Sequence, residues 1–255
     1  MEKSMQEYTL ETADKVFSFA TRFIHKNQSC FRGHIDSSYK LVPSVGRLPN
    51  LGSDLENLER EKFLLREFKM RSVMLLSHKP SNDWEWLSLA QHHGLPTRLL
   101  DWTMNPLVAL YFATCHSIEE LYSEKNLPDA AIYMLISHIY IDSLYRLEPF
   151  SIGEVMEFHA PLISTRVTNQ SGIFTAHPTP TIPFRTEKLK KFIIPGSLKR
   201  EIQARLSVLG IEESNIYPGL DGLAKSLKYK FFTDTCSSLG TTPTPDHAKS
   251  QIHGL

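Results

Sequence analysis

Apolar residues recur every three to four positions in several parts of this chain, which is the spacing of an amphipathic helix. Asp54 and Asp83 stand where helix caps are expected, and Asn105-Pro106 makes a helix start before a run that is almost entirely apolar. A helix with no polar face must be buried. The helices predicted from these patterns cover residues 9–26, 54–79, 83–93, 107–116, 197–209 and 220–228.

Short apolar runs bounded by glycine, proline or asparagine predict strands between these helices. The expected strands cover residues 29–35, 97–102, 130–136, 165–168, 173–176 and 191–194. Together the two kinds of element favour an α+β (mixed α/β) fold with a central mixed sheet flanked by helices. We expect an N-terminal helix in residues 1–28, a main domain in 29–234 and a loose polar tail in 235–255.

The overall charge does not point to a particular binding partner. With 28 basic and 28 acidic side chains and a pI of about 7.2, the chain has no general attraction to nucleic acid or to anionic lipid. No apolar stretch approaches the roughly 18 residues of a membrane span, and the first residues do not resemble a signal peptide. The 3 cysteines are widely spaced, which argues against a disulfide framework. We therefore expect a cytoplasmic, bacterial protein without a membrane partner.

The chemically densest segment of the chain runs from Gln91 to Trp102. The end of a helix, a Gly-x-Pro turn and a strand bring histidine, arginine, aspartate and tryptophan to one corner of the sheet, where ligands often bind. The alternative is a rigid turn held by pairing of Arg98 with Asp101, in which His92 and His93 only end the helix.

Alternation along the strand of this segment assigns its side chains to two faces. Thr97 and Asp101 face one side, and Arg98 and Trp102 face the other. A charge placed among apolar residues needs a partner, because its burial is otherwise costly. For Asp101 we expect that partner to be Arg32 on the earlier strand.

The histidines and cysteines do not favour a metal site or a thiol nucleophile. Adjacent residues on a helix such as His92 and His93 point about 100° apart, and no His-x-x-x-His or His-Glu-x-x-His occurs. Cys30 and Cys115 are expected in the core. The other histidines of this set are His34, His159 and His177, and they show no ligand spacing either.

Several motifs follow one another along most of the chain. They are Phe31-Arg32-Gly33, Pro43-Ser44 with Arg47, residues 91–102 leading into 105–113, residues 166–174, and Ile211 with residues 217–224. Their order and spacing resemble those of the FRG domain family, over residues 29–231. The resemblance implies a fold group more directly than a reaction.

A second and more distant similarity is to ADP-ribosyltransferases, and it is topological. In those enzymes an early strand carries an arginine or histidine, and a late strand carries the catalytic acid. The similarity implies catalytic roles for Arg32, Asp101 and Gln170, with NAD as the candidate cofactor and no metal. The arginine suits a dinucleotide phosphate, and Trp102 could stack on a base. The ligand-binding residues implied are Phe31, Gly33, Gln91, His92, His93, Thr97, Arg98, Trp102 and Phe174.

The chain departs from that pattern at the catalytic acid, because Gln170 or Ser171 stands where those enzymes have a glutamate. Asp101 is the preferred replacement, since its surroundings are apolar and aromatic. Glu154 and Glu157 are further candidates, because a spacing of three residues puts them on one face of a possible helix. A solvated helix face is the alternative interpretation of that pair.

The late strand is expected to complete the same site. We expect residues 170–174 to run along the sheet beside Phe31-Arg32-Gly33, so that Gln170 and Arg32 open onto one cleft with Trp102. Gly172 suits a close approach of a ligand or a neighbouring chain.

Two functions follow from these patterns. The first is an enzyme resembling ADP-ribosyltransferases that binds a nucleotide-like ligand and acts as a toxin or a phage-defence factor. The alternative is a non-catalytic recognition module that binds nucleic acid or protein through its basic second half. A solvated basic face is the simpler interpretation of that half. Its basic residues are Arg185, Lys188, Lys190, Lys191, Lys199, Arg200, Lys225, Lys228 and Lys230.

Overall fold

The computed structural model describes residues 5–23, 29–49, 52–121, 126–136, 147–158 and 172–238, without the side chains of residues 119 and 234–238. Gln170, Ser171 and His159 lie outside the described residues, as does the strand expected over 165–168. The predicted role of Gln170 therefore stays a prediction.

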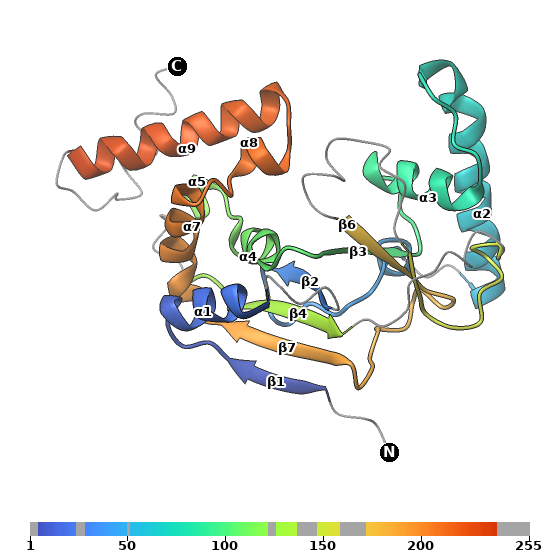
Figure 1. Ribbon diagram of the computed structural model, residues 1–255. Coiled ribbons are helices and arrows are strands. Elements are labelled where there is room, and N and C mark those ends of the chain that lie inside the picture. Colours follow the sequence, from blue (N-terminus) through green and yellow to red (C-terminus); the bar gives the residue numbers. More distant parts are fainter. Residues whose placement is uncertain are drawn as a thin grey trace.

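The described residues contain seven strands that form one sheet (Figure 1). All neighbouring strands are antiparallel except β1 and β7, which are parallel. The sheet is mixed and flanked by helices, which confirms the predicted α+β fold. In spatial order the strands are β1 (Gln6–Thr9), β7 (Leu189–Ile194), β4 (Ala130–Ile136), β2 (Ser29–His34), β3 (Leu99–Thr103), β6 (Gly172–Ala176) and β5 (Met156–Phe158).

The helices start where the sequence supplies caps. Ser53, one residue before the expected cap, forms a capping box with Glu56 at the start of α2, and Asn105 accepts a hydrogen bond from the backbone of α4. The helices are α1 (Ala13–Phe23), α2 (Asp54–Ser72), α3 (Asp83–His92), α4 (Pro106–Thr114), α5 (Ile118–Leu121), α7 (Lys199–Val208), α8 (Glu213–Ile216) and α9 (Leu220–Ser238). Short 3₁₀ segments occur at Val45–Arg47, Val73–Leu75 and Gly196–Leu198.

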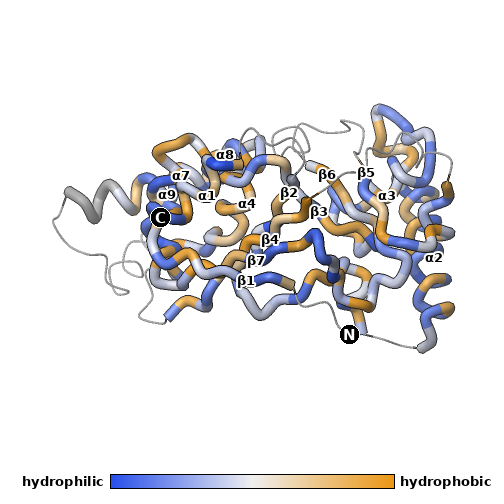
Figure 2. The backbone as a smooth tube through the Cα atoms, turned by 60° about the horizontal axis from the view of Figure 1, so that its bottom comes forward, coloured by the Kyte–Doolittle hydropathy of each residue, from blue (hydrophilic) through white to orange (hydrophobic). Residues whose placement is uncertain are grey.

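The core has separate parts over the two ends of the sheet. Helices α1, α4 and α7 pack with β2, β4 and β7, and helix α3 packs with β3, β5 and β6. Figure 2 shows hydrophobic positions gathered along the central strands and α4, whereas hydrophilic and hydrophobic positions alternate along α2. Figure 1 accordingly shows α2 and α3 at one end of the molecule and α7, α8 and α9 at the other.

The two halves of the sheet are joined weakly where β2 meets β3. These strands pair only at Phe31 with Thr103, whereas β2 pairs with β4 at six positions and β3 with β6 at five. Beyond that pair, β2 and β3 separate. Gly33 lies on the helical side of β2, where a Cβ atom would come within 2.0 Å of the carbonyl oxygen of Ala109 in α4. Glycine is therefore required for α4 to pack directly on β2.

Several boundaries differ from those expected from the sequence. A strand at Gln6–Thr9 precedes the first helix, because it pairs with β7 in a register that no local pattern specifies. The helix proposed for Glu154 and Glu157 is wrong, since β5 occupies Met156–Phe158. Helix α9 continues to Ser238, so the segment expected to be a loose tail begins with helical residues.

Candidate functional site

A cavity of about 250 Å³ lies where β2 and β3 separate, beside α3 and β6. We call it the β2–β3 cavity. Helix α4 and both strands contribute to its wall, so it is built by segments far apart in the sequence. The predicted site residues that line it are Phe31, Arg32, Gly33, Gln91, His92, Asp101, Trp102 and Phe174.

Arg32 occupies the space in which a regular sheet would have hydrogen bonds between β2 and β3. Its Nη1 donates to the backbone oxygen of Asp101 at 2.6 Å and lies 3.6 Å from the Asp101 carboxylate. Its Nε donates to Nε2 of His34 at 3.1 Å. Burial lowers the pKa of Arg32 from its usual value, the charge of Asp101 opposes this, and the nearby charge of Arg47 acts in the same direction as burial. The expected pairing of Arg32 with Asp101 is therefore present.

Asp101 is held by a chain of hydrogen bonds that reaches back to the turn before β3. Nε2 of Gln91, near the end of α3, donates to Oδ1 of Asp101 at 2.8 Å. Thr97 donates its hydroxyl hydrogen to Oε1 of the same amide, which fixes the orientation of the amide. Ser44 receives the backbone N–H of Thr97 at 3.0 Å. Thr97 thus positions the site without lining the cavity.

Two neutral histidines lie close to Arg32. Burial, together with the charge of Arg32, lowers the pKa of His34 to about 3. Burial and the charges of Arg32 and Arg98 lower the pKa of His177 to about 4. Nε2 of His177 lies 2.9 Å from the Thr175 hydroxyl oxygen. Because neither imidazole carries charge near neutral pH, the positive charge that lines this cavity is that of Arg32.

The aromatic residues predicted to bind the ligand are largely built into the core. Phe31 is fully buried against Phe19, and Phe174 stacks on Phe158. Trp102 is 3% exposed, and its indole N–H donates to Thr175 at 2.9 Å. A base cannot stack on the faces of a tryptophan that is packed in this way. These aromatic rings therefore support the cavity wall through their packing in the core and offer a ligand no open ring face.

Arg98 is placed elsewhere than the sequence suggested. It forms no pair with Asp101, because its guanidinium group hydrogen-bonds Glu61 of α2 through Nε and through Nη2, the latter at 2.7 Å. The pair is buried, with Arg98 1% and Glu61 3% exposed, and Arg98 also donates to the backbone oxygen of Pro149. The alternative of a turn held by Arg98 and Asp101 is therefore wrong, and the ligand-binding role of Arg98 stays a prediction.

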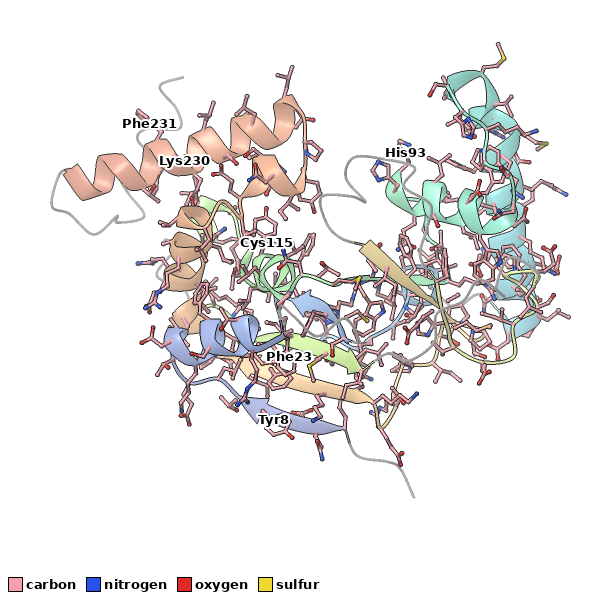
Figure 3. The ribbon with its side chains drawn as sticks, in the orientation of Figure 1. Tyr8, Phe23, His93, Cys115, Lys230 and Phe231 are labelled. Atoms are coloured by element: carbon pink, nitrogen blue, oxygen red, sulfur yellow. The ribbon has the colours of Figure 1, made fainter. Side chains whose placement is uncertain are left out.

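Other predicted site residues are divided between the cavity and the surface. His92 lines the β2–β3 cavity, whereas His93 is exposed at the end of α3, where Figure 3 labels it. Within the described parts of the chain, no group of three histidine, cysteine or acidic side chains could hold a metal ion.

The late strand reaches the cavity by a different route from the one expected. Strand β6 pairs with β3 and not with β2, so the position predicted beside Phe31-Arg32-Gly33 is wrong for residues 172–174, the described part of that segment. Gly172, Ile173 and Phe174 nevertheless line the cavity, because β6 is the next strand after β3 in the sheet.

Residues that sequence reasoning missed include Ser88 and Phe112, which line the cavity from α3 and α4, and Glu61. One signal could have identified Glu61. It lies three residues after Leu58 and four before Leu65, on the apolar face of α2, and a carboxylate in that position requires a buried partner.

The basic second half does not present a row of free lysines. Lys199 is fully buried, donates to the backbone oxygen of Ile35 at 2.5 Å and has its pKa lowered to about 8 by burial. Ion pairs engage three other lysines of the set. These pairs are Lys191 with Glu7, Lys225 with Glu213 and Lys230 with Glu212.

Comparison with known proteins gives one match. Residues 27–121 match the family model of the FRG domain, so the chain contains an FRG domain over this range. The range includes β2, α3, β3 and α4, which carry most of the β2–β3 cavity. The later motifs at residues 166–174 and 217–224 lie outside the match. Neither the curated proteins nor the solved structures gave a significant match. No helix in the described ranges is long and apolar enough to cross a bilayer.

Proposed function

We propose that the FRG domain of this protein binds a nucleotide-like ligand in the β2–β3 cavity, with NAD as the candidate, and transfers or releases its ADP-ribose part. The observation that carries the proposal is the convergence of Arg32 and Asp101 on one cavity from two strands that separate there. Such chemistry on a macromolecule is that of a toxin or a phage-defence factor.

Arg32 has the donors that a phosphate group requires. Its Nε and Nη1 are engaged, but Nη2 donates to no protein group among the described residues. The arginine side chain is 18% exposed, so its charge is only partly screened by water. A guanidinium group with free N–H donors at a cavity binds phosphate oxygens well.

Asp101 supplies the carboxylate that the chemistry needs. One of its oxygens accepts from Gln91, and the side chain is 61% exposed, so it retains lone pairs for a ligand hydroxyl. In the proposed step the bond from the anomeric carbon to the nicotinamide nitrogen breaks, and its electron pair leaves with nicotinamide. A hydroxyl group of the target or water bonds to that carbon and loses its proton. Asp101 would stabilise the positive charge that develops on the sugar.

The volume of the cavity limits which part of the ligand it holds. At about 250 Å³ it is slightly smaller than the roughly 300 Å³ at which the range of small-molecule sites begins. It is suited to one nucleoside half, with the phosphates at Arg32 and the other half outside.

A thermal-shift titration with NAD tests this function. Anything that binds only the folded chain raises the melting temperature, so the wild type should be stabilised by millimolar NAD. Arg32→Lys, which keeps the charge but loses the paired donors, and Asp101→Asn should each lose most of the shift. Glu154→Gln, which changes an exposed acid that does not line the cavity, is the control and should keep it. An unshifted wild type, or an equal loss in the control, would contradict the proposal.

A further inference from the structure

A second cavity, of about 590 Å³, lies between the end of α4 and the helices α7, α8 and α9. We call it the α4–α8 cavity. Figure 3 labels Cys115 at its α4 end, between α4 and the α8–α9 pair. Its volume falls within the range of small-molecule sites, and it shares no lining residue with the β2–β3 cavity.

Three tyrosines contribute to the wall of this cavity. Tyr111 lines it from α4, Tyr229 from α9, and Tyr217 from the residue that follows α8. Phe112 of α4 forms edge contacts with Tyr111 and Tyr217, at centroid distances of 5.5 and 6.5 Å, which holds these rings in place. Flat rings fixed by their neighbours suit a planar ligand, because stacking then costs little conformational entropy.

One carboxylate in the wall is oriented by two donors. Tyr111 donates its hydroxyl hydrogen to Oε2 of Glu213, and Lys225 lies 2.9 Å from Oε1. Burial, with the hydrogen bond to Glu213, raises the pKa of Tyr111, so the phenol stays protonated and keeps donating. Each carboxylate oxygen can accept a second hydrogen bond, for example from a sugar hydroxyl group.

Gln203 of α7 provides an amide oxygen that has no partner among the described residues. Its Oε1 is buried and accepts no hydrogen bond from the described residues, although the residue lines the cavity. Ser207 lines the same wall one helical turn later. Because a buried amide oxygen without a partner costs free energy, its position at a cavity gives a ligand with an N–H or O–H donor a contact to make.

Cys115 and His116 line this cavity, but their surroundings do not favour a nucleophile or a general base. Burial raises the pKa of Cys115 to about 11, so the thiol stays protonated. The side chain of His116 is engaged by Lys199, whose Nζ lies 3.0 Å from its Nε2. The cavity is therefore a binding site and not a second reaction centre.

We propose that the α4–α8 cavity binds the planar nitrogen heterocycle of a purine nucleoside. A carboxamide offers a donor and an acceptor side by side, which matches the exocyclic amine and N7 of adenine. Tyr217 and Tyr229, which are only partly buried, provide stacking walls, and Glu213 accepts from the sugar. This inference does not depend on the function proposed for the β2–β3 cavity.

Isothermal titration of the full chain with adenosine tests the proposal. The Gln203→Leu variant keeps the volume of the side chain but removes the amide, and should weaken binding about tenfold. Ser207→Phe fills the cavity and should abolish binding. Ala204→Phe adds the same ring to an exposed position of the same helix and should leave affinity unchanged. Circular dichroism of each variant reports whether the fold is kept.

The variant Asp101→Asn separates the two cavities. Adenosine binding that survives Asp101→Asn but fails in folded Gln203→Leu and Ser207→Phe supports the α4–α8 site. Binding lost in Asp101→Asn and kept in both α7 variants would place adenosine in the β2–β3 cavity and overturn the inference. Absence of any heat at millimolar adenosine would overturn it as well, without affecting the NAD titration.

Discussion

This protein has two arginine–carboxylate pairs that can be compared directly. Arg98, just before β3, pairs with Glu61, and Asp101, three residues later in β3, pairs with Arg32. Arg98 and Glu61 are 1% and 3% exposed and joined at 2.7 Å, and the Arg98 guanidinium group also donates to Pro149. Arg32 and Asp101 are 18% and 61% exposed, with 3.6 Å between Nη1 and the carboxylate. The first pair is buried and makes its hydrogen bonds within the protein, whereas the second leaves donors and lone pairs available.

The difference follows from what surrounds each pair. A buried ion pair must satisfy its hydrogen bonds within the protein, because water is absent, and removing one partner leaves an unpaired charge. A half-exposed pair contributes little to folding, and its groups can exchange protein contacts for a ligand. We therefore expect substitutions in the first pair to affect stability and those in the second to affect binding.

The largest effect is expected for Glu61→Gln. The change leaves Arg98 charged and without a carboxylate in the core, so the free energy of unfolding should fall by about 3–5 kcal/mol. Urea denaturation followed by circular dichroism measures the loss. Glu59→Gln, at an exposed position two residues earlier in α2, is the control and should change stability by less than about 0.5 kcal/mol. Equal effects of the two substitutions would remove the distinction between the pairs.

The second prediction concerns Gly33→Ala, a substitution that should displace Arg32 without changing it. In Gly33→Ala the new Cβ would lie 2.0 Å from a backbone oxygen of α4, which forces β2 and α4 apart. We expect a loss of about 3 kcal/mol, the upper end for overpacking. Because Arg32 moves with the strand, NAD stabilisation should fall too. Gly153→Ala, where no atom lies within 4 Å of the added Cβ, should be close to neutral. Normal stability in Gly33→Ala would contradict the packing of α4 on β2.

Local sequence patterns predicted where helices and strands lie along the chain better than which strands pair in the sheet. The helices after Asp83 and Pro106 and the strand over Ala130–Ile136 were predicted closely, because caps and apolar runs are local signals. Strand β1 was missed, since its four residues are all exposed and only pairing with β7 defines them. The position of β3 between β2 and β6 also depends on contacts between distant parts of the chain, so the spacing of residues along the sequence could not predict it.

For the candidate site, the pairing of Arg32 with Asp101 followed from side-chain alternation, whereas that of Arg98 with Glu61 did not. Alternation assigns a face but not a depth, so it could not distinguish a closed pair from an open one. The resemblance to the FRG domain family was confirmed over residues 27–121. The role of Gln170 stays a prediction.

The pH dependence of stability tests whether burial, with the charges of the nearby arginines, keeps His34 and His177 neutral. His34 and His177 have folded-state pKa values of about 3 and 4, below the 6.5 of a free side chain. The unfolded chain therefore binds protons first, and stability should fall as the pH drops from about 6.5 towards 4. At pH 5 the loss from His177, which is 2% exposed, should be about 2 kcal/mol.

Urea midpoints between pH 7 and 5 measure this slope. The slope should decrease in His177→Asn, which cannot be protonated, and should be unchanged in His93→Gln, which removes an exposed ring. A flat profile for the wild type would show that neither buried imidazole resists protonation.

The smallest effect on stability is expected for Asp101→Asn. The amide keeps the size of the carboxylate, and a pair with one partner 61% exposed contributes at most about 1 kcal/mol. The hydrogen bond from Gln91 can be kept by the remaining oxygen, so the urea midpoint should be close to that of the wild type. Binding should respond differently, because the lost charge is the one that faces the cavity and would stabilise the developing positive charge on the sugar. Urea denaturation and the NAD thermal shift measured on the same preparation decide between the roles. A loss of stability as large as that of Glu61→Gln would mean that both pairs hold the fold together and that the β2–β3 cavity has no acid to offer a ligand.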